Sequence, residues 1–229
     1  MITLHHLEKS RSFRVLWLLE ELKATYGLEY QLISYNRNIQ NLAPSELEQF
    51  HPMGKAPILV DDSLPQGEQA LAESALIIEY LLKFYDSRQQ FSTSNTFSSW
   101  RDYQFWLHFA EGSLMPPVVM KLILLKAVEK SPFFAKPIVR QVKAGAEKML
   151  LDGNIQKGLQ LLEKQLQGKE WLVDEKLTGA DIQLYFAAAG AIKISQLALD
   201  DFPNIARWLK HCEQRPAFKR AIELGGKPL

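Results

Sequence analysis

The sequence predicts a mixed fold, with an α/β region at the N-terminus followed by an all-α region. Up to about residue 85, short β-prone runs alternate with amphipathic segments, whereas the later apolar residues recur with the helical period. The stretch between these regions, residues 86–96, is polar and poor in core-forming residues, as linkers are. We therefore predict two domains, residues 1–85 and residues 97–229, joined by a linker over residues 86–96.

The first domain is predicted to follow the order β-α-β and then β-β-α. The first helix is expected over residues 10–24, because apolar residues recur at i, i+3, i+4 and i+7 from Val15 to Leu22. A short helix is expected over residues 45–50, and a longer one over residues 73–85. Strands are expected at residues 2–4, 30–34, 58–60 and 69–72.

The second domain is predicted to consist of helices alone. The Pro116-Pro117 pair is expected to bend or end the helix before it, because proline lacks the amide donor that a helix interior needs. Thr178 and Asp181 have the spacing of a capping box, so we interpret Asp181 as a residue for helix capping and folding and not as a catalytic acid. Helices are expected over residues 98–109, 155–166, 178–191, 201–213 and from residue 216 onward.

Composition and charge exclude several classes of protein. The 229 residues are 47% apolar and 23% charged, and the formal net charge is +1. This near-balance argues against a nucleic-acid binder, which needs a strongly basic face. No run approaches the ~18–20 apolar residues of a membrane span, and the N-terminus lacks the pattern of a signal peptide. We therefore expect no nucleic-acid partner, no membrane span and a cytoplasmic location.

Cysteine and histidine usage limits the chemistry further. Cys212 is the single cysteine, which excludes an internal disulfide and a CxxC redox pair, and we interpret it as a small core residue. The five histidines do not pair with one another at helical spacing, so we expect no metal site. The dinucleotide-binding glycine fingerprint, the phosphate-binding P-loop and the GxSxG elbow are all absent from the sequence.

Three short motifs stand where the predicted elements meet. Lys9-Ser10-Arg11-Ser12 lies where the first strand turns into the first helix. Gly54-Lys55-Ala56-Pro57 precedes the third strand, and Glu73-Ser74 opens the helix after the fourth. Taken singly, a serine at a helix start is most simply an N-cap, and a proline before a strand most simply marks where the strand begins. Their order and spacing together are more specific than any one of them.

With these motifs the chain resembles the soluble glutathione S-transferase family, and in particular its serine-type bacterial and fungal members. The segment Trp171-Leu172, followed by Leu177-Thr178-Gly179-Ala180-Asp181-Ile182, is also similar to the late helix-capping segment of that family. The resemblance runs over nearly the whole chain. It implies a thioredoxin-like N-terminal domain, glutathione as co-substrate, no metal, and a homodimer whose two sites face a shared cleft.

The resemblance also implies roles for individual residues. The backbone of Ala56, held by a cis Pro57, would pair with the cysteinyl part of glutathione like an added strand. Glu73 and Ser74 would hold the γ-glutamyl end, with the helix start favouring its carboxylate. Lys55 would suit the glycine carboxylate.

Two serines compete for the hydroxyl that donates to the glutathione sulfur. Ser10 fits the serine-type pattern better and would sit at the helix start, whereas Ser12 would more naturally cap the turn. We rank Ser10 first and keep Ser12 as the alternative. No tyrosine precedes Tyr26 and no cysteine precedes Cys212, which argues against the tyrosine-using and cysteine-using types. Lowering a thiol pKa by roughly 2 units takes about 2.7 kcal/mol, which a helix N-terminus and one hydroxyl can supply together.

The second substrate is expected to lie between the domains, where pockets commonly form. The competing interpretation of the candidate residues is plain helical core packing. Arg14 is expected to be a structural ion-pair partner. The candidates come from the segment that leads into the proline pair: Trp106, His108, Phe109, Glu111, Ser113 and Met115.

The leading hypothesis is a glutathione transferase that activates glutathione as a thiolate and conjugates it to a small hydrophobic electrophile. One alternative is a glutathione-transferase-like module that binds proteins without turnover. Another is a peroxidase, isomerase or dehalogenase activity at the same site. The joint presence of Ser10, Pro57, Glu73 and Ser74 favours an enzyme.

Overall fold

The computed structural model describes residues 1–40, 42–63 and 69–228, and in this part of the chain four strands form one mixed sheet. Strand β1 (Ile2–Leu7) is parallel to β2 (Tyr30–Tyr35) and antiparallel to β3 (Ile58–Asp61), and β4 (Gln69–Ala72) lies antiparallel to β3. The order across the sheet is therefore β2-β1-β3-β4. All four strands lie where the sequence predicts them, and β1 continues beyond its expected end to Leu7.

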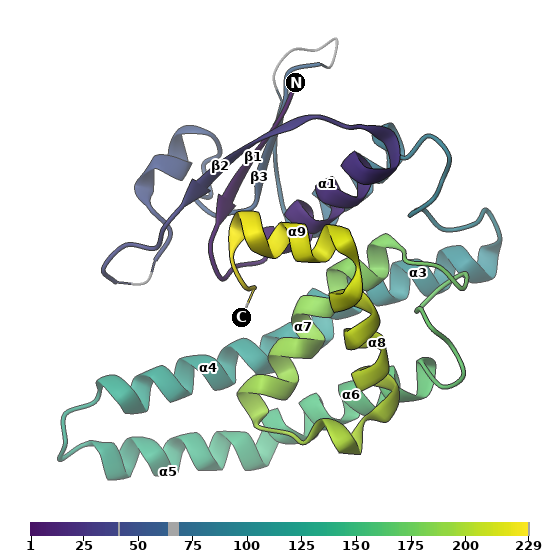
Figure 1. Ribbon diagram of the computed structural model, residues 1–229. Coiled ribbons are helices and arrows are strands. Elements are labelled where there is room, and N and C mark those ends of the chain that lie inside the picture. The colour runs from purple at the N-terminus through teal and green to yellow at the C-terminus, as the bar shows by residue number, and fades with distance from the viewer. Residues whose placement is uncertain (41, 64–68, 229) are drawn as a thin grey trace.

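Helix α1 (Ser12–Tyr26) lies between the sheet and the helical part of the molecule. It contacts β1 and α2 (Ser74–Tyr85) as well as α7 (Gly179–Ser195) and α9 (Pro216–Gly225), and Figure 1 shows α9 beside it. Every residue from Ser12 to Leu22 is consequently buried. The predicted start at Ser10 is two residues early, because Ser10 belongs to the turn that precedes the helix.

The sheet region also holds the short 3-10 helix η1 (Ser45–Gln49), and the described chain after α2 consists of helices joined by loops. The predicted class, an α/β part followed by an all-α part, is confirmed. Helix α7 runs through the middle of the helical part and is buried along most of its length. The other segments are α3 (Phe97–Phe109), η2 (Ala110–Leu114), α4 (Met115–Lys130), α5 (Lys136–Ala146), η3 (Glu147–Leu151), α6 (Asp152–Gln165), η4 (Leu199–Asp201) and α8 (Pro203–Gln214).

The proline pair acts differently from the prediction. Helix α3 passes through the π-helical turn η2 directly into α4, and Pro116 and Pro117 lie in the first turn of α4. Proline is tolerated at that position because the first amides of a helix have no intrahelical acceptor. The prolines therefore begin a helix and do not end one. In Figure 1, α4 and α5 then form a long hairpin that extends away from the sheet.

The segment 86–96 has no helix or strand, but side chains hold it in place. The buried carboxylate of Asp86 accepts hydrogen bonds from the amides of Gln90, Phe91 and Ser92, at 2.8–2.9 Å. Phe91 is buried in the main core, and its carbonyl accepts a bond from the Gly179 amide at 3.2 Å. These contacts fix how the sheet region meets α7.

Asp181 supports the fold as the sequence predicts. Its fully buried carboxylate accepts bonds from the amides of Leu172 and Thr178, the Thr178 hydroxyl and the Trp208 indole, all at 2.9–3.0 Å. The capping box at the start of α7 is therefore extended to α8 and to the loop before α7. Cys212 is fully buried in the core, also as predicted, and burial raises the pKa of its thiol.

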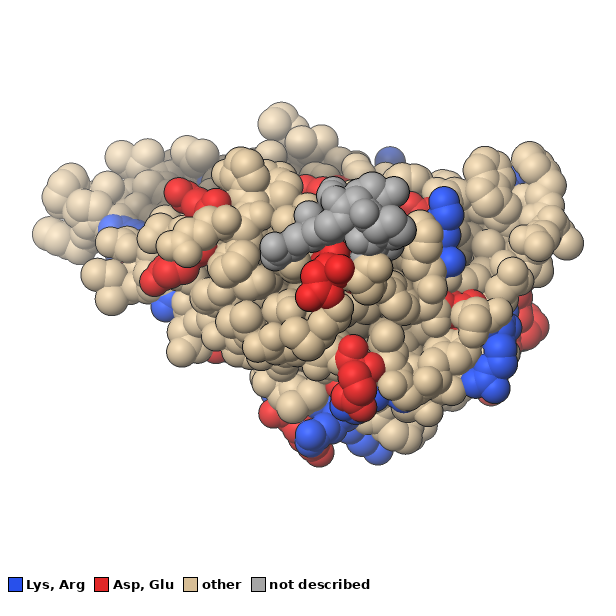
Figure 2. Space-filling view, turned by 90° about the horizontal axis from the view of Figure 1, so that it is seen from above, with Lys and Arg blue, Asp and Glu red and all other residues tan. Residues whose placement is uncertain are grey.

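Acidic and basic side chains are interspersed on the face shown in Figure 2, as the net charge of +1 leads one to expect. No helix in the described part of the chain is both long and apolar enough to cross a membrane.

Candidate functional site

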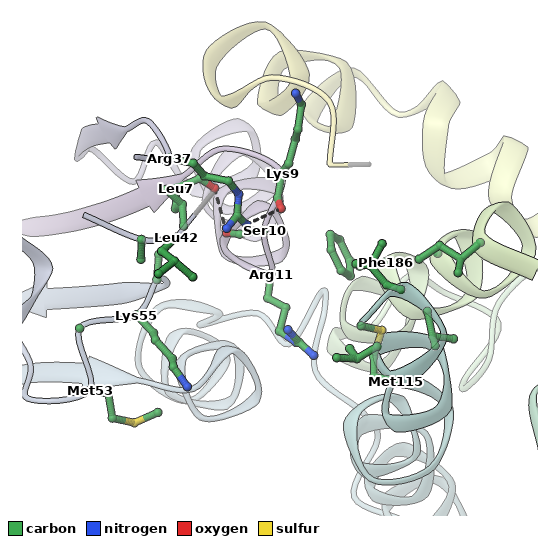
Figure 3. Close-up of a pocket in the computed structure, with 18 residues that line it drawn as sticks. Leu7, Lys9, Ser10, Arg11, Arg37, Leu42, Met53, Lys55, Met115 and Phe186 are labelled. Atoms are coloured by element: carbon green, nitrogen blue, oxygen red, sulfur yellow. Dashed lines mark hydrogen bonds between the residues drawn. The ribbon is translucent and has the colours of Figure 1, made fainter. Parts of the chain in front are cut away.

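A cavity of about 520 Å³ lies between the sheet region and the helices α4 and α7. Its volume is in the range of small-ligand sites. Figure 3 shows its two sides: Leu7, Ser10, Arg37 and Lys55 face Met115 and Phe186, which lie on the right of the view. The charged and hydroxyl side chains of the lining all lie on the sheet side, and the helix side is apolar. The sheet side is formed by Leu7, Lys9, Ser10, Arg11, Arg37, Leu42, Ala43, Met53, Gly54, Lys55 and Ala56, and the helix side by Met115, Val118, Val119, Leu122, Phe186, Gly190 and Ile194.

The structure separates the two candidate serines. Ser10 lines the cavity and is half-buried, whereas the Ser12 side chain is completely buried behind it. The Ser12 hydroxyl oxygen accepts a bond from the Leu7 amide at 3.1 Å and lies 2.8 Å from His6 Nδ1. Ser12 thus joins the end of β1 to the start of α1, and Ser10 presents its hydroxyl to the cavity.

Ser10 is positioned by the turn between β1 and α1. Its hydroxyl donates to the Leu7 carbonyl at 2.8 Å, lies 2.9 Å from the Ser12 hydroxyl and accepts a bond from the Ser12 amide at 3.2 Å. Lys9 directly before it has a left-handed backbone, with φ of 47°, and its carbonyl accepts a bond from Arg37 at 2.9 Å. The first turn of α1 carries no acidic residue, so its positive end is not compensated from within the helix.

The buried His6 side chain supports this turn through its contact with the Ser12 hydroxyl. Its Nε2 lies 3.0 Å from the Gly225 carbonyl, which can only accept, so Nε2 carries the proton and Nδ1 accepts from Ser12. Burial lowers the pKa of His6, against the raising effect of the hydrogen bond to the Gly225 carbonyl. The neutral ring fits this pattern because Nδ1 must stay unprotonated to accept. A side chain at Gly225 would meet His6, since a Cβ there would lie 2.6 Å from Nε2.

The second motif also borders the cavity. The Ala56–Pro57 peptide bond is cis, as the resemblance implies. Pro57 is buried, whereas Ala56 is half-buried and lines the cavity together with Gly54 and Lys55. The Lys55 side chain is exposed. The backbone just before β3 is therefore open to a ligand that runs alongside it.

The third motif lies outside the described lining of this cavity. Glu73 is exposed and directly precedes α2, with φ of 74°. The Ser74 side chain is buried, donates to the Gln183 carbonyl oxygen at 3.1 Å and accepts from Arg14 at 3.1 Å. The Ser74 hydroxyl proton is thus used in the bond to Gln183 on α7. What Ser74 and its neighbours offer to a ligand is the free amides of the first turn of α2.

Arg14 is the structural ion-pair partner that the sequence predicts. Its guanidinium is 1% exposed, contacts Glu111 at 2.6 Å and lies over the Phe186 ring, 5.1 Å from the centroid. Burial lowers the pKa of Arg14 to about 10, against the opposing charge of Glu111. Arg11 also binds Glu111, with Nε 2.9 Å from each carboxylate oxygen. Burial alone would raise the pKa of Glu111, but the charges of Arg14 and Arg11 hold this pKa below its usual range.

The structure places the six residues predicted to bind the second substrate in different surroundings. Of these six, Met115 is the one within the described lining of the cavity. Glu111 is paired with Arg11 and Arg14, and Trp106 is buried in the helical core. His108, Phe109 and Ser113 border a separate surface hollow on α3 beside Trp100 and Phe105. Successive residues of a helix point around its axis, so one segment cannot direct all six side chains to one side.

The apolar wall of the cavity was not predicted. It consists of Met115, Val118, Val119 and Leu122 on α4, and Phe186, Gly190 and Ile194 on α7. A signal for it exists in the sequence, because each set recurs at intervals of three or four residues and so occupies one helix face. The same spacing also describes a core-facing stripe. In the described residues no cluster of three His, Cys, Asp or Glu side chains could hold a metal ion.

Comparisons with known proteins match both parts of the chain to one family. The family model of the glutathione S-transferase N-terminal domain matches residues 1–83, and that of the C-terminal domain matches residues 116–216. Glutathione S-transferase 3 of Schizosaccharomyces pombe is 34% identical over 223 residues, or 97% of this chain and 87% of that protein.

Two solved structures extend this likeness to the fold. A glutathione S-transferase from Actinobacillus pleuropneumoniae is 33% identical, with a TM-score of 0.75 over 98% of this chain and 93% of that one. The glutathione transferase Ure2p6 from Phanerochaete chrysosporium, solved in complex with oxidized glutathione, is 26% identical, with a TM-score of 0.74 over 100% of this chain and 97% of that one. The chain belongs to the glutathione S-transferase family.

Proposed function

We propose that the protein binds glutathione in the cavity between the sheet region and α4 and α7, activates it as a thiolate at Ser10, and conjugates it to an electrophile. The observation that carries the proposal is the placement of Ser10. Ser10 lines the cavity just before α1 and is half-buried, whereas the Ser12 side chain is completely buried. The solved relative with oxidized glutathione supports the choice of co-substrate.

Ser10 can stabilise a thiolate because its proton is able to turn. In the free protein the hydroxyl donates to the Leu7 carbonyl at 2.8 Å, and that carbonyl also lies 3.0 Å from the Ser12 hydroxyl. When the Ser10 proton turns to the sulfur, it exchanges a bond to a neutral carbonyl for a stronger bond to a charged acceptor. The positive end of α1 and the cation of Arg11 add to the attraction. A thiol with a pKa near ~8.5 is thereby ionised at neutral pH.

The rest of glutathione is proposed to follow the sheet edge. Ala56 pairs with the cysteinyl backbone and Lys55 with the glycine carboxylate, since both border the cavity. The γ-glutamyl carboxylate is proposed to bind the free amides at the start of α2, with Glu73 accepting from the ammonium group. Ser74 contributes its amide there, because its hydroxyl is engaged with Gln183 and Arg14.

The electrophile is proposed to lie against the helix side. Met115, Val118 and Phe186 belong to an apolar wall that faces Ser10 across the cavity. Such a wall removes an apolar molecule from water and holds it beside the thiolate. Bringing the two reactants together in one orientation supplies much of the rate acceleration.

The test is a calorimetric titration with glutathione, followed by conjugation to 1-chloro-2,4-dinitrobenzene. The wild-type protein is expected to give a one-site isotherm and saturable conjugation. Ser10→Ala is expected to lose most of the conjugation while still binding glutathione. Ser87→Ala, an exposed serine in the segment after α2, is the matched control and keeps wild-type rates. Binding without conjugation of any electrophile, or no binding at all, would favour a protein-interaction role instead.

The same proposal includes a homodimer, which the resemblance implies. Exposed apolar side chains along the α4–α5 hairpin are compatible with a partner subunit, among them Ile123, Phe133, Phe134, Ile138 and Val142. Light scattering during gel filtration gives the mass in solution and so tests this part directly.

A further inference from the structure

The far end of the hairpin formed by α4 and α5 is apolar and uncovered. Figure 1 shows this end well away from the sheet. The loop between the two helices presents Phe133 and Phe134, which are 86% and 71% exposed. Ile138 and Val142 lie one turn apart on α5 and are also exposed, and no residue of α5 is buried. An exposed apolar surface of this kind marks a place of interaction.

Basic side chains surround these apolar ones. We define the hairpin tip as residues 126–142, which contain four basic residues and one acidic residue. The formal charge of the hairpin tip is therefore +3, whereas the whole chain carries +1 and the remainder −2. Glu129 pairs with Lys126 at 3.0 Å. In the described part of the chain no carboxylate forms an ion pair with the other three, Lys130, Lys136 and Arg140.

This excess of one sign argues against a second copy of the chain as the occupant of the hairpin tip. An interface around a two-fold axis brings the same patch of both subunits together, so these cations would meet their own copies. Like charges placed together weaken an interface. The surface of α3 has no such imbalance, because Phe97 and Trp100 are exposed there near the Arg101–Asp102 ion pair. That surface remains available to a partner subunit.

We propose that the hairpin tip docks on an anionic lipid surface. Phe133 and Phe134 enter the boundary between headgroups and acyl chains, where apolar side chains leave water without crossing the bilayer. Lys130, Lys136 and Arg140 pair with the anionic headgroups beside them. The two features act together, because an apolar contact and a basic patch each give only weak, reversible binding on their own.

Docking in this way has a consequence for the cavity. Helix α4 leads from the hairpin tip to the cavity wall, since Leu122 lines the cavity and Lys130 ends the helix about 12 Å further along its axis. A docked protein thus holds its cavity near the lipid, where apolar electrophiles dissolve. This consequence rests on the proposed function, whereas the docking itself does not.

The test is flotation of the full chain with lipid vesicles in a density gradient. One set of vesicles is phosphatidylcholine alone, and the other contains about one third phosphatidylserine. Each basic side chain near an anionic surface strengthens binding about fivefold, so three of them predict roughly a hundredfold preference for the anionic vesicles. Raising the salt concentration should reduce this preference, because it screens the charges.

Variants of the hairpin tip separate the two contributions. The double variant Phe133→Ser/Phe134→Ser should bind anionic vesicles at least about tenfold more weakly, through the loss of apolar burial. The double variant Lys130→Glu/Lys136→Glu should lose the preference for anionic vesicles. All four side chains are exposed or half-buried, so the fold does not depend on them.

Matched controls make the same changes elsewhere on the surface. Phe97→Ser on α3 and the double variant Lys157→Glu/Lys210→Glu on α6 and α8 alter exposed residues outside the hairpin tip, and both should bind like the wild type. A label adds a local readout. Cys212 is fully buried, so an environment-sensitive dye on Ser131→Cys reports from the hairpin tip, and its emission should shift to the blue with anionic vesicles.

The docking is wrong if the wild-type chain does not float with anionic vesicles, or floats equally well with phosphatidylcholine alone. It is also wrong if the variants of the hairpin tip float like the wild type. Loss of the dimer mass in Phe133→Ser/Phe134→Ser, with no flotation of the wild type, would identify a subunit contact instead. Glutathione binding and conjugation should be unchanged in these variants. A failed docking therefore leaves the proposed function standing, and an inactive chain that still floats refutes only the proposed function.

Discussion

Replacing Ser10 and Ser12 one at a time by alanine tests the assignment of the catalytic hydroxyl. The two hydroxyl oxygens lie 2.9 Å apart, yet the structure predicts opposite consequences. Ser10 borders the cavity, and its loss removes the donor to the glutathione sulfur. Ser12 is completely buried, and its loss removes a support of the fold.

The magnitude for Ser10→Ala follows from one hydrogen bond to a charged group. Such a bond contributes about 1.5–3 kcal/mol, which corresponds to a rise of about 1–2 units in the pKa of the bound thiol. The free energy of unfolding should change by less than about 1 kcal/mol, because the lost bonds are half-exposed.

The magnitude for Ser12→Ala follows from the groups that it leaves without partners. The Leu7 amide loses its acceptor and His6 Nδ1 loses its donor, both in the protein interior. At about 1–3 kcal/mol for each of these two buried groups, the free energy of unfolding should fall by about 2–6 kcal/mol. The thiol pKa should change little, provided that the variant is measured while folded.

The assay is the ultraviolet absorbance of bound glutathione thiolate as a function of pH, together with urea unfolding of each variant. Ser87→Ala again serves as the exposed control, with neither quantity changed. The assignment is refuted if Ser12→Ala raises the thiol pKa while Ser10→Ala leaves it at the wild-type value. It is also refuted if Ser10→Ala destabilises the protein as much as Ser12→Ala, since the two roles would then not be separate.

Three further predictions follow from single contacts. Lys55→Met should raise the Kd for glutathione about fivefold, through the loss of one exposed ion pair, and an unchanged calorimetric Kd would argue against its role. Asp181→Ala should lower the free energy of unfolding by about 3–5 kcal/mol, because four buried donors lose their acceptor, and a loss below about 1 kcal/mol in urea unfolding would contradict this. Burial lowers the pKa of His6 from 6.5, so the unfolded chain takes up a proton that the folded ring resists, and stability should fall as the pH drops below 6.5. The His6→Asn variant should lose that part of the slope, and identical pH profiles of unfolding free energy for it and the wild type would show that His6 is not the group involved.

The elements of the fold could be predicted from local patterns because local chemistry decides them. The stripe from Val15 to Leu22 marks α1, and the Thr178–Asp181 spacing marks the start of α7. Where the pattern was ambiguous, the prediction failed. The Pro116-Pro117 pair suits either the end of one helix or the first turn of the next, and only the continuous path of α3, η2 and α4 decides between them.

Some features of the candidate site could likewise be predicted from the sequence, and others depend on the tertiary structure. By itself the sequence determined the class of fold, the three motifs around Ser10, Pro57 and Ser74, and the structural roles of Asp181 and Cys212, since each depends on residue type and short spacing. Tertiary structure alone decided which serine faces the cavity, and that Glu111 is held by Arg11 and Arg14. It also decided that α7 supplies part of the apolar wall. The physical reason is that a helical stripe looks the same in sequence whether it faces a core or a cavity. Pairs about a hundred residues apart, such as Arg14 and Glu111, meet only when the helices pack.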